Sequence, residues 1–221
     1  MKRKLIIYGV GKTAELAHYY FTNDSQYEVV AFTVDSIYLD SETFCGLPVF
    51  QFEDIETRFS VEAVYFFAAI ANSQMNKVRE NKVKEAKKKG FRLASYISTK
   101  ATLFGNVRIG EHCFILEDNT IQPFVEIGDN NILWSGNHIG HHSKLGHNNF
   151  ITSHVVVSGN TVIGNNCFLG VNSTLRDGIE IANESLIGAG SFITRSTKKK
   201  DVYKSKFNEK SNTNSDQIQG M

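Results

Sequence analysis

Three six-residue units follow one another at residues 137–154: Asn137-His-Ile-Gly-His-His142, Ser143-Lys-Leu-Gly-His-Asn148 and Asn149-Phe-Ile-Thr-Ser-His154. The third place of each unit is aliphatic, and it stays aliphatic through sixteen consecutive units. These residues are Leu103, Ile109, Ile115, Ile121, Ile127, Leu133, Ile139, Leu145, Ile151, Val157, Ile163, Leu169, Leu175, Ile181, Ile187 and Ile193. A period of six fits neither an α-helix nor a single strand. It predicts a hexapeptide solenoid in which three units form one coil and each aliphatic side chain points inward.

The neighbours of the aliphatic residues agree with this prediction. Small or short polar residues usually stand two places earlier, where an inward corner has little room. Asn119 and Asn137 are eighteen residues apart, as are Asn131 and Asn149, so each pair is expected to form an amide ladder between coils. Glycine often follows the aliphatic residue, as at Gly140, and we expect it to serve a turn with unusual φ and ψ.

The N-terminal segment carries a glycine-rich motif, Gly9-Val-Gly-Lys-Thr-Ala14, between an apolar run and an apolar helix. A second strand, Tyr27 to Val34, ends at Asp35. This order matches the dinucleotide fingerprint, in which glycines let the backbone approach a phosphate at a helix N-terminus and an acidic residue binds a polar group of the nucleotide. Gly9, Gly11 and Asp35 are therefore candidate ligands of a nucleotide, although the glycines alone would also suit a plain tight turn.

Further elements complete a β-α-β-β-α-β unit of about 95 residues. We expect strands over 61–70 and 91–97, and between them a helix that is capped by Asn72 or Ser73 and runs to Gly90. Such a unit has room for one mononucleotide half rather than the two halves of a dehydrogenase.

Units such as Val107-Arg-Ile-Gly-Glu-His112 and Thr161-Val-Ile-Gly-Asn-Asn166 resemble those of bacterial acyltransferases with a left-handed parallel β-helix. With its N-terminal segment, the chain resembles, from residue 1 to about 195, the sugar acetyltransferases of the sialic-acid O-acetyltransferase type, whose relatives N-acetylate nucleotide-linked amino sugars. The resemblance implies a Rossmann-like nucleotide-sugar domain (1–98), a left-handed β-helix acetyltransferase domain (99–196) and a polar tail (197–221). It also implies acetyl-CoA as co-substrate, a homotrimer, and a role in building surface polysaccharide such as lipopolysaccharide.

Five of the seven histidines lie between His138 and His154, outside the inward aliphatic positions. Imidazole suits a general base for acetyl transfer from a thioester, which needs no metal. By resemblance, His141 aligns with the catalytic base of the family, about two coils from Gly159. The family has an acidic residue next, and this chain has His142, so His141 and His142 are the candidate catalytic residues. His112 lies apart from this cluster, and its substitution is expected to change turnover little.

The same resemblance suggests that acetyl-CoA runs along a groove between neighbouring solenoids. The backbone near Gly159, Val171 and Ala189 matches the places where the family contacts this co-substrate. Ordinary corner residues are the alternative interpretation of these three positions.

Charge and composition indicate which partners and which cellular compartment to expect. A net charge of +1 gives no global reason to expect nucleic acid or an anionic membrane, and no apolar run approaches the length of a membrane span. Three cysteines, an odd number, favour a reducing cytoplasm over a disulfide framework.

Three alternatives to the N-acetyltransferase remain open. The first is O-acetylation of a sugar, and the second is a non-catalytic protein that binds a nucleotide-sugar. The third is a zinc enzyme similar to the γ-class carbonic anhydrases. His142 and His147 have the spacing of two zinc ligands in that class, but Asn106 stands where the third histidine is expected.

Overall fold

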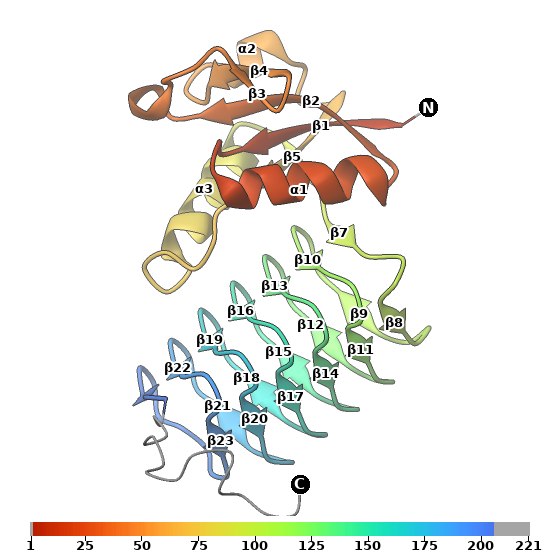
Figure 1. The fold of residues 1–221 in the computed structure, drawn as a ribbon, viewed down its shortest axis with the longest axis vertical. Coiled ribbons are helices and arrows are strands. Elements are labelled where there is room, and N and C mark those ends of the chain that lie inside the picture. Colours follow the sequence, from red (N-terminus) through yellow and green to blue (C-terminus); the bar gives the residue numbers. More distant parts are fainter. Residues whose placement is uncertain (1, 206–221) are drawn as a thin grey trace, which may run out of the picture.

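The computed structural model describes residues 2–205, so most of the predicted C-terminal tail, from residue 206 onward, lies outside the described part. The solenoid has three faces of short parallel strands (Figure 1). The first face contains β7 (Tyr96–Ile97), β10 (Phe114–Ile115), β13 (Ile132–Leu133), β16 (Phe150–Ile151), β19 (Phe168–Leu169), β22 (Leu186–Ile187) and β24 (Val202–Tyr203). The second face contains β8 (Thr102–Leu103), β11 (Thr120–Ile121), β14 (His138–Ile139), β17 (Val156–Val157), β20 (Thr174–Leu175) and β23 (Phe192–Ile193). The third face contains β9 (Arg108–Ile109), β12 (Glu126–Ile127), β15 (Lys144–Leu145), β18 (Val162–Ile163) and β21 (Glu180–Ile181).

The predicted coil of eighteen residues is confirmed by the strand register. Ile115 pairs with Leu133, which pairs with Ile151, and the other two faces repeat the same step. These aliphatic side chains stack inside the prism, where Ile115, Leu133 and Ile151 are fully buried. Parallel strands and the hexapeptide repeat together fit a left-handed β-helix.

The three corners between the faces have a common geometry that differs from the expectation. The left-handed backbone conformation falls on the sixth place of a unit, as at Asn130 (φ 58) and His142 (φ 59), and not on the glycine after the aliphatic residue. That glycine serves close packing instead. A Cβ on Gly140 would lie 2.5 Å from the backbone nitrogen of Gly159 in the next coil. We name the corners by the faces they join: the first corner joins faces one and two, the second joins faces two and three, and the third joins faces three and one.

One of the two expected amide ladders is confirmed. Asn137 Nδ2 donates to Asn119 Oδ1 at 3.0 Å. The second pair is linked differently, because the backbone N–H of Asn149 donates to Asn131 Oδ1 at 2.9 Å. The side-chain nitrogen of Asn149 is buried without a hydrogen-bond partner among the described residues.

The N-terminal domain is built around a mostly parallel sheet of order β3-β4-β2-β1-β5-β6. Its strands are β1 (Arg3–Tyr8), β2 (Tyr27–Val34), β3 (Thr43–Phe44), β4 (Leu47–Gln51), β5 (Val64–Ala68) and β6 (Arg92–Leu93). Its helices are α1 (Lys12–Asn23), α2 (Ile55–Arg58), α3 (Lys77–Lys88) and the short 3-10 helix η1 (Ser36–Tyr38). Side chains of β1 alternate between the α1 side of the sheet, where Leu5 and Ile7 lie, and the α3 side, where Ile6 and Tyr8 lie.

The secondary structure of this domain differs from the expected one in three places. The sequence did not predict the β3–β4 hairpin or α2. The segment 91–97 contains two strands: β6 joins the N-terminal sheet, and β7 pairs with β10 in the solenoid. Helix α3 begins at Lys77 rather than just after Asn72 or Ser73, because Gln74, Met75 and Asn76 all have left-handed backbone angles that delay the first turn.

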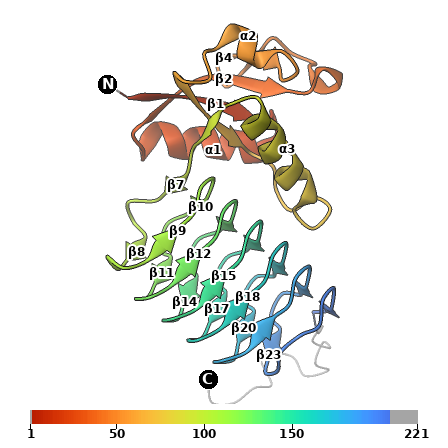
Figure 2. The ribbon, with the colours of Figure 1, turned by 180° about the vertical axis from the view of Figure 1, so that it is seen from behind.

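The N-terminal domain docks on the first face of the solenoid. Figures 1 and 2 show α1 between the sheet and the coils, and the loop before α3 reaching toward the solenoid. Outward side chains of the first face, Phe114, Ile132 and Phe150, share one buried cluster with Phe21 and Phe67 of the N-terminal domain. This apolar contact fixes which side of the prism the domain covers.

Hydrogen bonds of a buried arginine and a buried histidine join the N-terminal domain to the solenoid at the third corner. The fully buried guanidinium of Arg79 donates to Asn130 Oδ1 at 3.0 Å and to the carbonyl oxygens of Ala71 and Asn149 at 2.8 and 3.2 Å. His112, 1% exposed, accepts the N–H of Ala68 on Nε2 at 2.8 Å, and its Nδ1 lies 2.8 Å from Asn130 Oδ1. Burial lowers the pKa of Arg79 to about 9 and that of His112 to about 3, with the charge of Arg79 adding to the latter shift. The sequence did not indicate this structural role of His112 as a neutral part of the junction, and the expectation that its substitution changes turnover little stays a prediction.

The last described residues extend the first face. Strand β24 pairs with β22, so the start of the predicted tail covers the final coil. Among residues 2–205, we find no helix with the length and apolar character that crossing a membrane requires.

Candidate functional site

The second corner carries the two candidate catalytic residues side by side. His141 and His142 follow strand β14, and both side chains are exposed. Their Nδ1 atoms lie 3.1 Å apart, and the two rings meet edge to face at 85°. The sequence predicted both residues, but it gave no sign that their imidazoles would contact each other.

Residues from the coil before hold this pair in place. The backbone N–H of His141 donates to Gln122 Oε1 at 2.9 Å. The ring of His142 stacks on Phe124, with centroids 4.6 Å apart, and its backbone N–H donates to the carbonyl of Pro123. The sequence did not point to Gln122 and Phe124, although both lie in the register of the pair, eighteen or nineteen residues earlier.

Gly159 covers His141 from the coil after. It lies one coil away and not two, as the sequence had suggested. A Cβ at this position would lie 2.8 Å from Cε1 and 2.9 Å from Nε2 of His141. Because real Cβ atoms do not approach so closely, a glycine here leaves the Nε2 edge of the imidazole its room.

The remaining histidines of the cluster are dispersed around the prism. His138 lies half-buried on the outer side of β14, and His154 lies at the first corner against Gly136. His147 lies at the third corner, where its Nδ1 accepts the backbone N–H of Asp129 at 2.9 Å. His142 and His147, the two zinc ligands considered above, thus occupy different corners. Within residues 2–205, no three His, Cys, Asp or Glu side chains gather as a metal site.

The other two candidate contacts for acetyl-CoA lie at the first corner. Val171 is 42% exposed, and Ala189 is exposed one coil later. They repeat the unit position of His141 and Gly159, which stack in the same way at the second corner. The structure therefore places these four residues along the two edges of the second face.

The candidate nucleotide ligands lie in the N-terminal domain, where the parallel strands end. Gly9 has φ +116, and a Cβ on it would lie 3.3 Å from the carbonyl of Ala69, so this position needs glycine. Gly11 is the extended N-cap of α1 and has no atom within 4 Å of where its Cβ would stand. A small cavity of 160 Å³ adjoins this loop, lined by Val10 and by residues of segment 38–49 that include Asp40.

Asp35 ends the neighbouring strand β2, but its carboxylate is already paired. Lys82 Nζ lies 2.7 Å from Asp35 and 2.6 Å from Glu85. Burial acts to lower the pKa of Lys82, but the hydrogen bonds that its ammonium donates to the two carboxylates raise the pKa above its usual value. The same ammonium lies 4.8 Å from the ring centre of Tyr8, whose pKa is raised by burial and by Asp35. Asp35 thus binds α3 across the strand end.

The structure does not bring the two groups of site residues together within one chain. The N-terminal domain covers the first face and the third corner, whereas His141 and His142 lie at the second corner, the one that the first face does not touch.

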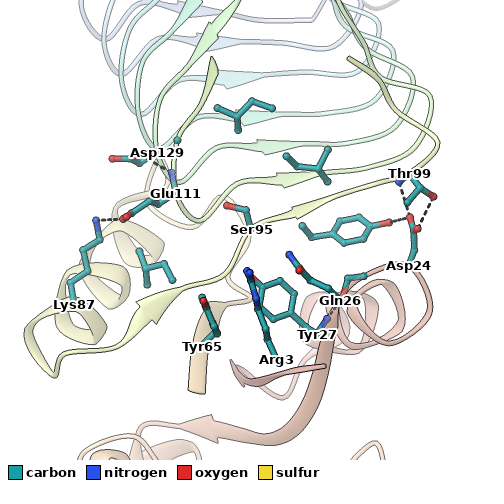
Figure 3. A pocket seen from close by; sticks show the side chains of 16 residues that line it. Arg3, Asp24, Gln26, Tyr27, Tyr65, Lys87, Ser95, Thr99, Glu111 and Asp129 are labelled. Carbon is teal, nitrogen blue, oxygen red and sulfur yellow. Dashed lines mark hydrogen bonds and ion pairs between the residues drawn. The ribbon is translucent and has the colours of Figure 1, made fainter. Parts of the chain in front are cut away.

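A cavity of 940 Å³ lies away from both groups, between the N-terminal domain and the first coils (Figure 3). Lys87 pairs with Glu111 at 2.6 Å on its wall. Asp24 accepts hydrogen bonds from Tyr96, Ser98 and Thr99, and these lower its pKa to about 2 although burial acts to raise it. Because these carboxylates are already paired with donors of the chain itself, we interpret this cavity as part of the junction between the N-terminal domain and the solenoid, and not as a catalytic site.

Known proteins share this repeat and this fold. The family described as the bacterial transferase hexapeptide (six repeats) matches residues 106–140, and the hexapeptide repeat of succinyl-transferase matches residues 160–195. No curated protein sequence matches the chain.

Two solved proteins illustrate the structural similarity. The acetyltransferase domain of PglB from Neisseria gonorrhoeae has a TM-score of 0.81 at 23% identity, covering 91% of this chain and 96% of that one. The same domain in complex with acetyl coenzyme A has a TM-score of 0.76 at 23% identity, covering 87% and 93%. PerB from Caulobacter crescentus, in complex with CoA and GDP-perosamine, has a TM-score of 0.75 at 23% identity, covering 87% and 89%. Two segments of the solenoid thus match the hexapeptide repeats of bacterial transferases, and about nine-tenths of the chain shares the fold of these acetyltransferase structures.

Proposed function

We propose that this protein is an acetyl-CoA-dependent N-acetyltransferase that acts on a nucleotide-linked amino sugar, of the 4-amino-4,6-dideoxy kind, for surface polysaccharide. The observation that carries the proposal is the His141 corner, where an exposed imidazole stands beneath a glycine that keeps its Nε2 edge open. The shared fold with proteins captured with acetyl coenzyme A and with GDP-perosamine supports the choice of substrates.

In this reaction the sugar amine attacks the thioester carbonyl of acetyl-CoA in a ternary complex. A C–N bond forms and the C–S bond breaks. His141 Nε2 takes the proton that the amine loses and passes it to the leaving CoA thiolate, which departs as the thiol. A neutral imidazole suits both transfers near neutral pH, and such a base contributes about 10²–10⁴-fold to the rate.

The co-substrate would lie along the second face, between Gly159 at one edge and Val171 and Ala189 at the other. The carbonyls of Gly159 and Val171 already accept the N–H groups of Gly178 and Gly190, so the amides of a pantetheine arm would bind mainly to the backbone N–H groups of these corners. The metal-free chemistry follows from the thioester, which is already activated.

The amino sugar would be held through its nucleotide by the N-terminal domain (1–98), which we interpret as Rossmann-like. The open space above Gly11 and the N-terminus of α1 suit a diphosphate. The proposal that Gly9 and Gly11 bind the nucleotide is better supported than that for Asp35. Asp35 can contact a nucleotide only if it gives up its ion pair with Lys82.

The separation of the two groups of residues supports a site shared between copies of the chain. A nucleotide-sugar bound above Gly11 and a base at the second corner of the same solenoid lie on different sides of the prism. In a closed cyclic homotrimer, the N-terminal domain of one copy would bring the sugar to His141 of its neighbour. We therefore propose a cytoplasmic homotrimer whose solenoid domain spans 99–196, followed by the tail at 197–221.

The direct test is turnover with nucleotide-linked amino sugars and acetyl-CoA, followed by release of the CoA thiol and by mass analysis of the sugar. We expect an increase of one acetyl group on nitrogen, and a fall in kcat of about 10²–10⁴-fold in His141→Asn with KM for both substrates nearly unchanged. An acetyl ester would instead identify a sugar O-acetyltransferase. Binding of the nucleotide-sugar without any CoA release would identify a non-catalytic binding protein, and zinc-dependent CO₂ hydration would identify the carbonic anhydrase alternative. Each of these three results contradicts the proposal.

A further inference from the structure

We propose that His142 is the positioning residue of the base: its neutral imidazole accepts the Nδ1–H of His141, so that the two rings hold one proton between them and leave His141 Nε2 unprotonated for the substrate. This inference rests on the proposed function of His141. It assigns to a second imidazole the orienting task for which a carboxylate is the usual partner of histidine.

The hydrogen bond itself limits the protonation states. Two Nδ1 atoms 3.1 Å apart can hold only one proton between them, because two protons would clash and two lone pairs would repel. One ring is therefore the Nδ1–H tautomer and the other carries its proton on Nε2. If His141 is the donor, its Nε2 lone pair faces the space that Gly159 leaves open.

The backbone around His142 favours a fixed partner over a mobile surface residue. Its φ of 59 lies in the left-handed region, and asparagine has a positive φ at the same sixth place at five other corners, Asn130, Asn148, Asn160, Asn166 and Asn172. Phe124, directly beneath it, has φ 65, which is a strained conformation for an aromatic residue. Strained residues persist where the surroundings require them, and here the strain places an aromatic ring flat against the imidazole of His142 at 4.6 Å.

No carboxylate competes for the task. Among the described residues, neither His141 nor His142 has an Asp or Glu oxygen within 4.0 Å, whereas His147 lies 3.6 Å from Asp129. The coil before presents Gln122, Pro123 and Phe124 to the pair, and the coil after presents Ser158, Gly159 and Asn160, none of which ionises.

Asp177 occupies the place of Gly159 one coil further on, and among the described residues it makes no ion pair with His141 or His142 within 4.0 Å. His138 lies on the outer side of β14, and Lys144 on β15 pairs with Glu126 at 3.4 Å. The tautomers of the pair are therefore set by the contact between the two rings.

The same contact determines what happens when His141 takes the proton of the amine. The imidazolium keeps donating its Nδ1–H to His142, and this bond becomes charge-assisted and stronger. A second proton would put two positively charged rings 3.1 Å apart, where they repel each other.

Three substitutions at position 142 separate this role from a structural one. His142→Asn keeps the left-handed backbone and can place an acceptor oxygen near the present Nδ1. His142→Asp places a carboxylate there. His142→Phe keeps the stacking on Phe124 and removes the acceptor. We expect kcat/KM to fall about 3- to 10-fold in the Asn variant and about 100-fold in the Phe variant. We also expect the acid limb of the pH profile of His142→Asp to move upward by about 0.5–1 pH unit, because a negative neighbour stabilises the imidazolium of His141.

The deciding measurement is independent of turnover. Nitrogen-15 NMR of histidine-labelled protein at pH 8 should show His141 protonated on Nδ1 and His142 protonated on Nε2, with assignments from the His141→Asn and His142→Asn spectra. If both residues carry their proton on Nε2, or if the Phe variant is as active as the Asn variant, the proposal is wrong. If the NMR pair is present but no sugar is acetylated, the proposed function fails and the paired imidazoles stand.

Discussion

The buried His112 predicts an acid sensitivity of folding that can be worked out from its environment. Burial, with the positive charge of Arg79 beside it, lowers the pKa of this imidazole from 6.5 to about 3 in the folded protein. Protonation therefore favours the unfolded chain. The stabilising contribution of the neutral ring is complete above pH 6.5 and falls by about 1.4 kcal/mol for each pH unit toward pH 3.

Between pH 7 and pH 5, this single group should lower the free energy of unfolding by about 2 kcal/mol. The interval is chosen because Asp24, whose pKa is lowered to about 2, contributes only at lower pH. Urea titrations at pH 7, 6 and 5 measure the change, with the fluorescence of Trp134 as reporter, since this side chain packs at the junction beside Phe150. Protein concentration is held constant because dissociation of an oligomer would add its own dependence.

The matched control is His112→Asn, since asparagine occupies the same left-handed position at Asn130 and Asn148. The variant should be less stable at pH 7, because it gives up the contact with Ala68, and its stability should change less with pH. The difference between wild type and variant should shrink by about 2 kcal/mol from pH 7 to pH 5. An unchanged difference across this interval would refute the assignment of a neutral, buried imidazole at the junction.

Two further predictions concern the site. Gly159→Ala should lower kcat by about 100-fold, because its Cβ would lie 2.8 Å from the ring of His141 and must displace it; Gly105→Ala, three coils earlier at the same corner and in open space, is the control that should leave kcat near wild type. Equal activity of the two alanine variants would show that the imidazole has room to spare. If the site is shared between copies, random trimers of Gly11→Val and His141→Asn chains should recover about a quarter of wild-type activity, whereas no recovery would place both groups of residues in one chain's site. Gly11→Val should still fold, since no atom of the chain opposes a Cβ there and its backbone is extended.

The solenoid could be predicted almost completely from the sequence, because one residue in every six must point inward and only aliphatic side chains stack in so narrow a prism. The N-terminal domain was predicted less well. Strand β2 was placed residue for residue, but the hairpin of Thr43–Phe44 and Leu47–Gln51 was not expected. Its strands are two and five residues long, too short for a clear alternation of polar and apolar residues. The left-handed turn at 74–76 was missed for a related reason, since Gln74 and Met75 rarely adopt positive φ.

The repeat pattern does not predict the role of a histidine at a corner of the solenoid. Histidine occupies the sixth, left-handed place of a unit at His112, His142 and His154, and the sequence gives these positions the same local pattern. Their surroundings differ because each belongs to a different corner. His112 faces the N-terminal domain and is buried against Ala68, His142 faces the outside and contacts His141, and His154 covers Gly136. Which corner the N-terminal domain covers depends on the outward aromatic residues of the first face, such as Phe114, that pack with Phe67. The environment of a corner histidine thus depends on how the N-terminal domain packs against the solenoid. The hexapeptide repeat alone does not predict that packing.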